Sequence, residues 1–214
     1  MAAMYFRRGN EMSPSKYRVR RIFRWLMQPI GERLAGAGVR PDTVTYLSLH
    51  LAILGLVLFL LTLNQWLYAL FVFLVGILDG IDGVVARASG SSTPMGAFTD
   101  SIMDKVSEII LLLALVLSFP GQFVLGVGVP VWGMLCVSGW LLTSYLRSRA
   151  EALGVKDLDV GLGGRSERLF TLLLFSLFFQ VLWGLVVVTF MGVLTAAYRF
   201  YHYKRELTDS YHQI

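Results

Sequence analysis

Three long stretches of the sequence contain no charged side chain. Asp, Glu, Lys and Arg are absent from residues 43–78, 109–146 and 169–198, which are stretches of 36, 38 and 30 residues. A membrane-spanning helix needs about 20 mostly apolar residues, so each stretch is too long for one span. Only 15% of the 214 residues are charged, against roughly 25% in soluble domains, which argues against a soluble globular enzyme.

Each uncharged stretch predicts a helical hairpin that crosses the membrane twice. Turn-forming residues mark the reversals at Asn64-Gln65, at Pro120-Gly121-Gln122 and near Trp183-Gly184. Backbone polar groups at membrane depth must be paired internally, so we expect an all-α integral membrane protein with six transmembrane helices. These spans are expected at roughly 43–63, 66–87, 96–118, 128–149, 167–183 and 185–205.

The basic residues set the expected orientation. None of the 19 Lys and Arg residues lies in a reversal, so all of them fall on one side of a six-span protein. The positive-inside rule then places both termini in the cytoplasm. The single Cys136 leaves no disulfide framework, and the N-terminus lacks the apolar core of a cleavable signal, so we expect it to be retained.

The first 40 residues predict an amphipathic helix at the membrane interface. Nine basic residues precede Pro41, and we expect a kink at Pro29. The apolar face follows helical spacing and consists of Val19, Ile22, Phe23, Leu26, Met27, Ile30 and Leu34, with Arg18, Arg21 and Arg24 off that face. We interpret residues 1–40 as a basic anchoring segment that is attracted to membrane lipids, 41–206 as the six-span domain and 207–214 as a short polar tail.

Four aspartates are expected to meet at the cytoplasmic end of the second and third spans. Asp79 and Asp82 lie one turn apart, as do Asp100 and Asp104, and the connection between the pairs is short and turn-rich. Arg87 and Lys105 supply only two positive charges nearby. Two divalent cations would neutralise the cluster, and oxygen ligands favour Mg²⁺, Mn²⁺ or Ca²⁺ over zinc. The alternative is a set of polar residues at helix ends, paired with Arg and Lys.

Small residues flank the same aspartates. Gly83 and Ala86 follow Asp79 and Asp82 at one-turn spacings, and Gly96 lies one turn before Asp100. Such positions allow a bulky ligand such as a nucleotide to approach the helices closely, or they serve ordinary helix packing.

Together these residues form the string Asp79-x-x-Asp82-Gly83-x-x-Ala86-Arg87, then eight residues, then Gly96-x-x-x-Asp100-x-x-x-Asp104. This string resembles the signature of the CDP-alcohol phosphatidyltransferase family. The resemblance implies a six-span membrane enzyme, usually a homodimer, that moves a phospholipid phosphate from a CDP-activated lipid to an alcohol and releases CMP. It implies no nucleic-acid partner.

The resemblance also implies roles for individual residues. Asp79, Asp82, Asp100 and Asp104 would hold two divalent cations, Mg²⁺ first and Mn²⁺ second, and Asp104 would also act as the base toward the acceptor hydroxyl. The positions expected to bind the CDP-lipid are Asp42, Thr43, Val44, Thr45, Gly83, Ala86, Arg87, Thr93 and Gly96.

Two cytoplasmic segments suggest the acceptor. Arg-x-Arg-Ala-Glu-Ala at 147–152 and Arg-Ser-Glu-Arg-Leu at 165–169 are similar to the subgroup that uses inositol phosphate, the phosphatidylinositol phosphate synthases of actinobacteria and the archaetidylinositol phosphate synthases of archaea. We therefore expect a phosphorylated polar alcohol as partner and the cytoplasmic membrane of a prokaryote as location. The residues that would bind this acceptor are Arg147, Arg165, Arg168 and Arg199. The actinobacterial pattern often has Lys where Arg147 stands.

Several alternatives stay open on the sequence. The acceptor could be glycerol 3-phosphate, which would also require a basic pocket, or another alcohol, and the lipid could be CDP-diacylglycerol or CDP-archaeol. A divalent-cation transporter is the alternative of another class. The sequence argues against it because the acids lie toward one face of the membrane and no inverted repeat is visible.

Overall fold

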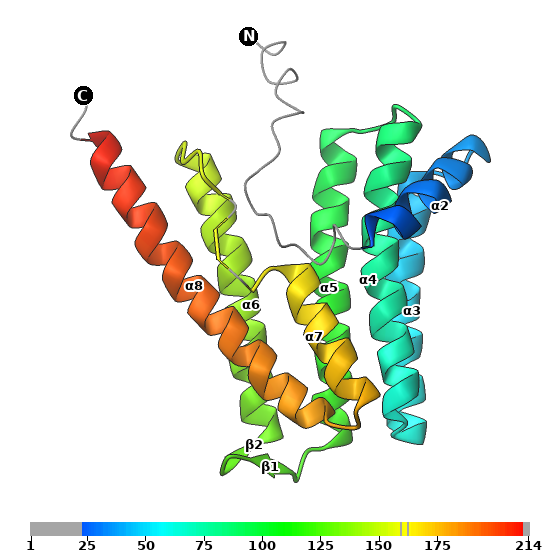
Figure 1. Cartoon of the computed structure of the whole chain (residues 1–214), viewed down its shortest axis with the longest axis vertical. Coiled ribbons are helices and arrows are strands. Elements are labelled where there is room, and N and C mark those ends of the chain that lie inside the picture. The colour runs from blue at the N-terminus through cyan, green and yellow to red at the C-terminus, as the bar shows by residue number, and fades with distance from the viewer. Residues whose placement is uncertain (1–22, 159, 162, 212–214) are drawn as a thin grey trace.

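The computed structural model describes residues 23–211, except residues 159 and 162 (Figure 1). Within these residues the chain is mostly helical, which confirms the all-α expectation, and a short β-hairpin joins α5 to α6. Arg18, Val19, Arg21 and Ile22 of the expected amphipathic helix lie outside the described residues. The elements are α2 (Arg24–Gly36), α3 (Pro41–Thr62), α4 (Gln65–Ala88), α5 (Pro94–Ser118), β1 (Phe123–Val124), β2 (Val127–Gly128), α6 (Val129–Ala152), α7 (Arg165–Leu177) and α8 (Val181–Tyr211).

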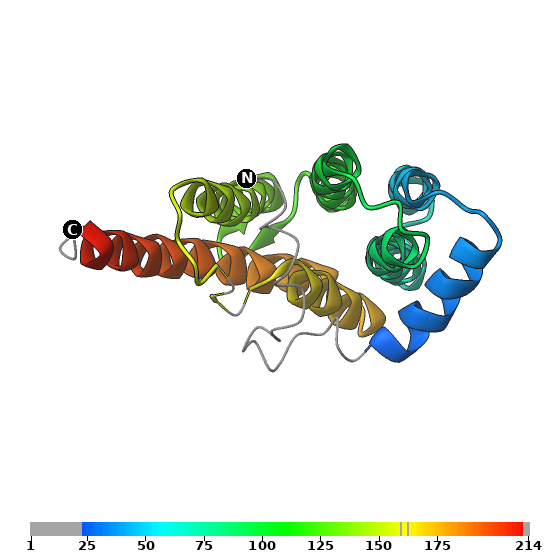
Figure 2. The same ribbon diagram turned by 90° about the horizontal axis from the view of Figure 1, so that it is seen from above.

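Helices α3 to α8 form a bundle in two layers. Figure 2 shows α3, α5 and α6 in one layer and α4, α7 and α8 in the other. Each helix packs against two others, so that the contacts close a ring in the order α3, α4, α7, α8, α6, α5. Helices α4 and α5 touch each other little although a short loop joins them. Helix α3 thus links α4 to α5 in the ring.

Four of these helices, among the described residues, are long and apolar enough to cross a membrane: α3, α4, α6 and α8. Helix α5 has 25 residues, but Asp100, Asp104, Lys105 and Glu108 make its first half polar. Helix α7 has only 13 residues, about 20 Å at a rise of 1.5 Å per residue. Its first turn lies well below the end that α5 and α6 reach (Figure 1).

The turn between α3 and α4 lies where the sequence predicts it. Helix α3 ends at Thr62, and the Asn64 side chain caps α4 by accepting hydrogen bonds from Trp66 N at 3.0 Å and Leu67 N at 3.2 Å. An asparagine cap of this kind satisfies backbone N–H groups that have no partner inside the helix. Local chemistry alone thus fixes this reversal.

The break between α7 and α8 lies elsewhere, and the prediction of a reversal near Trp183-Gly184 was wrong. The chain turns at residues 178–180, where Phe179 adopts φ 56° and Gln180 N donates to Phe175 O at 2.8 Å. Gly184 lies inside α8, and a Cβ there would come within 2.7 Å of the Phe175 Cβ. The glycine therefore allows two helices to approach closely and does not form a turn.

Helix α2 lies beside α4 at the end of the bundle that contains the α4–α5 loop (Figure 1). Met27 of α2 forms a buried apolar cluster with Val44, Ile81 and Val85. The two helices also approach closely at Gly31, where an added Cβ would lie 2.5 Å from Val84 Cγ1. The face of α2 that the sequence marks as apolar thus packs, at least in part, against protein.

Gly31→Ala should destabilise the fold by forcing α2 away from α4. We expect a loss of about 1–3 kcal/mol in the free energy of unfolding, the usual cost of overpacking. The measurement is the midpoint of thermal unfolding in detergent micelles. Gly36→Ala is the matched control, because it lies in the same helix and its Cβ would meet nothing within 4 Å. Val84→Ala should restore most of the loss, and an unchanged midpoint for Gly31→Ala would refute the close packing of α2 on α4.

Candidate active site

Three aspartates converge between α4 and α5. Each of Asp79, Asp82 and Asp100 contributes one carboxylate oxygen to a group of three that lie within 4.8 Å of one another. Asp82 is 4% exposed, and Thr45 of α3 donates a hydrogen bond to its Oδ2 at 3.0 Å. Helices α3, α4 and α5 together hold this group of negative charges, which could bind a cation.

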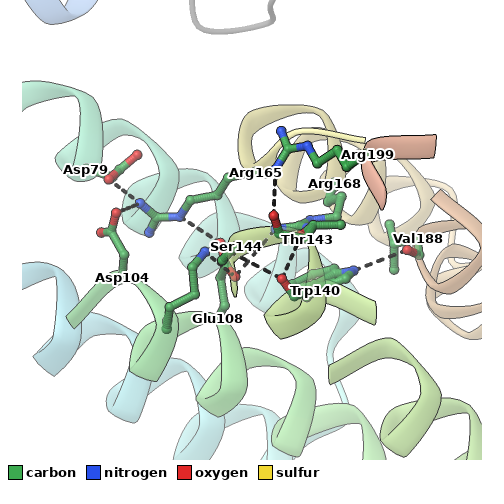
Figure 3. A network of polar contacts seen from close by, with 11 residues as sticks. Asp79, Asp104, Glu108, Trp140, Thr143, Ser144, Arg165, Arg168, Val188 and Arg199 are labelled. Atoms are coloured by element: carbon green, nitrogen blue, oxygen red, sulfur yellow. Dashed lines mark hydrogen bonds and ion pairs between the residues drawn. The ribbon is translucent and has the colours of Figure 1, made fainter. Parts of the chain in front are cut away.

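The fourth aspartate is joined to the group through an arginine of α7. Arg165 Nη1 forms ion pairs with both Asp79 and Asp104, as Figure 3 shows. The sequence analysis counted only Arg87 and Lys105 as positive charges near the aspartates. That count was incomplete, because the fold brings Arg165 to the cluster from more than 60 residues away in the sequence.

Glu108 is a member of the site that sequence reasoning missed. Its side chain is 2% exposed and is surrounded by three cationic groups. The partner atoms are Lys105 Nζ at 3.0 and 3.1 Å, Arg165 Nε at 2.9 Å and Arg168 Nη2 at 3.6 Å. Asp100, Asp104 and Glu108 follow at intervals of four residues, which places them on one face of α5. That spacing was the available signal.

Arg168 and Arg199 converge on Thr143 of α6. Arg168 is 2% exposed, donates from Nη1 to Thr143 Oγ1 at 3.1 Å, and lies 4.4 Å from the ring centre of Trp140. Arg199 is 7% exposed and donates to Thr143 O at 2.7 Å and to Val160 O at 3.0 Å. Figure 3 shows both guanidinium groups gathered around Thr143, next to Arg165. A buried network of this kind holds the two arginines in defined positions.

One cavity of about 1110 Å³ connects these groups. Its lining includes all four aspartates, all four arginines expected to bind the acceptor, and Gly83 and Arg87 of the expected nucleotide site. Figure 3 shows Asp79 and Asp104 on one side of Arg165, and Arg168 and Arg199 on the other, and we call these the acidic and basic ends of the cavity. A ligand that fits such a cavity has one anionic group that binds cations held by the aspartates and another anionic group that binds the arginines.

The other positions expected to bind the CDP-lipid lie, in the described part of the chain, outside this lining. Thr45 contacts Asp82, and Val44 belongs to the apolar cluster under α2. Thr93 caps α5 by accepting from Gly96 N at 3.0 Å, and a Cβ on Gly96 would lie 3.9 Å from Asp42 Oδ1. The complete set outside the lining is Asp42, Thr43, Val44, Thr45, Ala86, Thr93 and Gly96.

Comparison with known proteins agrees with this geometry. The family model described as CDP-alcohol phosphatidyltransferase matches residues 39–200. The chain is 31% identical over 183 residues to archaetidylinositol phosphate synthase of Pyrococcus horikoshii. This match covers 85% of this chain and 92% of the relative. It is 32% identical over 182 residues to phosphatidylinositol phosphate synthase of Mycobacteroides abscessus, which covers 83% of this chain and 80% of the relative.

Solved structures show the same fold. Phosphatidylinositol phosphate synthase of Mycobacterium tuberculosis with CDP-DAG bound has a TM-score of 0.69 at 24% identity, over 84% of this chain and 94% of that chain. The same enzyme with manganese and citrate has a TM-score of 0.70 at 24% identity, over 83% and 88%. The family match over most of the sequence, supported by the aspartate cluster and the shared fold, shows that this chain belongs to the CDP-alcohol phosphatidyltransferase family of transferases.

Proposed function

We propose that the protein transfers the phosphatidyl-type group of a CDP-activated lipid, CDP-diacylglycerol or CDP-archaeol, to inositol phosphate. The products are CMP and a lipid with a phosphoinositol phosphate headgroup. The cavity that joins four aspartates to four arginines is the observation on which the proposal depends. The names of the relatives, which are synthases of archaetidylinositol phosphate and phosphatidylinositol phosphate, support the acceptor. Family membership decides against the transporter hypothesis.

We assign two divalent cations, Mg²⁺ first and Mn²⁺ second, to Asp79, Asp82, Asp100 and Asp104. The residues fit such ions because Asp79, Asp82 and Asp100 bring carboxylate oxygens, the hard ligands that these ions prefer, within 4.8 Å of one another, and Asp104 lines the same cavity. The fold neighbour solved with manganese supports the assignment. When bound, the cations would neutralise the diphosphate and stabilise CMP as a leaving group.

Asp104 is proposed to accept the proton of the acceptor hydroxyl. The hydroxyl oxygen then bonds to the phosphorus next to the lipid, and the bond between that phosphorus and CMP breaks. Asp104 suits this role because it lines the cavity close to Arg165, at the border between the acidic and basic ends. Asp42, Thr43, Val44, Thr45, Gly83, Ala86, Arg87, Thr93 and Gly96 remain the proposed positions for the CDP part of the donor.

Arg147, Arg165, Arg168 and Arg199 are proposed to bind the phosphate of the acceptor. Arginine suits this role because its guanidinium group can donate two parallel hydrogen bonds to a phosphate. All four line the cavity, with Arg165 beside the aspartates, and neutral partners already orient Arg199. A phosphate bound there would place the rest of the acceptor toward Asp104.

We further propose that all six helices α3 to α8 reside in the cytoplasmic membrane of a prokaryote, as the domain of residues 41–206, and that the protein is a homodimer. The distribution of basic residues supports cytoplasmic termini and a cytoplasmic site. The α3–α4 turn, the β-hairpin and the α7–α8 turn lie at the end of the bundle opposite to the α4–α5 loop, and these connections contain no Lys or Arg (Figure 1). Residues 1–40 would then anchor the protein at the lipid surface and 207–214 would form the polar tail.

The proposed acceptor can be tested with a panel of alcohols. Membranes that contain the protein should release CMP from labelled CDP-lipid when Mg²⁺ and inositol phosphate are added, and EDTA should abolish the release. Glycerol 3-phosphate should give much less CMP. Release with glycerol 3-phosphate but not with inositol phosphate would identify the alternative acceptor, and no release with any alcohol would refute the proposed reaction.

Asp104→Asn should lower kcat about 10²- to 10⁴-fold, the range expected when a general base is lost. Binding of CDP-lipid should change much less, because Asp79, Asp82 and Asp100 remain. Single-turnover CMP release and equilibrium binding of labelled CDP-lipid separate the two effects. Unchanged turnover would show that another group accepts the proton.

Arg199→Ala should raise KM for inositol phosphate about tenfold or more and leave KM for CDP-lipid nearly unchanged, because a charge-assisted hydrogen bond contributes about 1.5–3 kcal/mol. Steady-state kinetics with each substrate varied in turn provides the measurement. Arg205→Ala is the control, since this arginine lies on the same helix but is largely exposed. Equal effects on both KM values would indicate a structural role for Arg199.

A further inference from the structure

Glu108 is a buried carboxylate that lies behind the cavity. It is 2% exposed and, among the described residues, is not part of the cavity lining, whereas its partners Lys105, Arg165 and Arg168 are. It is therefore placed to act on a substrate through these cationic side chains and not directly. Burial of a carboxylate is costly unless strong partners compensate it, so its position needs an explanation.

The contacts of Arg165 supply that explanation. Its Nη1 atom contacts Asp79 and Asp104, while its Nε atom lies 2.9 Å from Glu108 Oε1 (Figure 3). The guanidinium group is thus held from two sides, by the aspartates of the acidic end and by Glu108. Glu108 attracts the guanidinium group of Arg165 from the side opposite to Asp79 and Asp104.

Glu108 also contacts the second arginine of α7. Arg168 Nη2 lies 3.6 Å from Glu108 Oε2, and Thr143 Oγ1 accepts from Arg168 Nη1 at 3.1 Å. Arg165 and Arg168 are like charges on successive positions of one helix face, and both are largely buried. One carboxylate between them offsets their repulsion and holds both guanidinium groups in place beside the cavity.

We propose that Glu108 is a positioning residue that holds Arg165 and Arg168 for the phosphate of the acceptor and competes with the aspartates for Arg165. This inference rests on the proposed function, in which the arginines bind the acceptor and the aspartates bind divalent cations. Glu108 would thus affect both the binding of the acceptor phosphate by the arginines and the binding of cations by the aspartates.

Two opposite effects compete when Glu108 is neutralised. A more positive cavity would bind phosphate more tightly, whereas the loss of the Nε contact would let the aspartates draw Arg165 toward the acidic end. The geometry favours the second effect, because Glu108 is the carboxylate that Arg165 Nε contacts, and its loss would leave Asp79 and Asp104 as the carboxylates that hold Arg165. Arg165 would then be held by the aspartates alone, so it would be less available to the acceptor and would compete more strongly with cations for the same carboxylates.

Glu108→Gln should therefore raise KM for inositol phosphate about 10- to 100-fold, as the loss of a supporting contact to a binding group typically does. KM for CDP-lipid should change less than twofold. Binding of Mn²⁺ to the purified protein in detergent, followed by the EPR signal of free Mn²⁺, should weaken severalfold. Glu151→Gln is the matched control, because it removes the same charge from an exposed carboxylate of the same cavity.

The sign of the KM change decides the proposal. An unchanged or lower KM for inositol phosphate, or Mn²⁺ binding equal to that of the wild type, would overturn it. In a cycle with Arg168→Gln the effects on KM should be less than additive, and full additivity would also overturn it. If Glu108→Gln does not fold, Glu108→Asp should show a smaller shift in the same direction.

Failure of the proposed acceptor can be told apart from failure of this inference. If the wild-type protein uses glycerol 3-phosphate and not inositol phosphate, the proposed function fails. The same comparison of Glu108→Gln with the wild type is then made with glycerol 3-phosphate, whose phosphate presents the same chemistry to the arginines. A raised KM would support the role of Glu108, and an unchanged KM would refute it.

Discussion

The balance of buried charge between α4, α5 and α7 is the constraint on which the site depends. Asp79 and Asp104 come from different helices, and Arg165 of a third helix contacts both. Charged groups of this kind are costly in an apolar environment unless they are paired, so each helix requires the others in register. The same ion pairs therefore contribute to the fold and define the chemistry of the cavity.

The helix ring provides the space in which these charges meet. Helices α4 and α5 are joined by a short loop but separate, because α3 packs against both of them. On the opposite side, α6 and α8 pack closely. A Cβ added at Gly139 of α6 would lie 3.0 Å from Val193 N of α8. Close contacts elsewhere in the ring accompany the cavity of the site, which polar residues of five helices line.

Much of this arrangement could be predicted from the sequence, because several of its features are local. The uncharged stretches indicate the apolar helices, and the cap at Asn64 depends only on its neighbours in the chain. The aspartates are recognisable because their spacing follows the helical period. Each of these signals is contained within a few turns of helix.

The remaining features depend on contacts between distant segments. Gly184 is typical of a turn in sequence, yet it serves the packing of α7 against α8, and only the position of Phe175 distinguishes the two roles. Glu108 resembles the charged end of an apolar helix until Arg165 and Arg168 are placed beside it. The position of Arg165 between both ends of the cavity could not be inferred either, since it follows from the depth at which α7 begins.

That depth gives the cavity a simple geometric origin. Helix α7 has 13 residues, whereas α5 and α6 have 25 and 24, a difference of about 17 Å in length. Residues that lead into α7 run along α8 instead, where Val160 O accepts from Arg199 and Gly163 N donates to Thr195. The cavity thus lies where α7 begins late relative to α5 and α6, and residues from the first half of α7, Arg165 among them, line it.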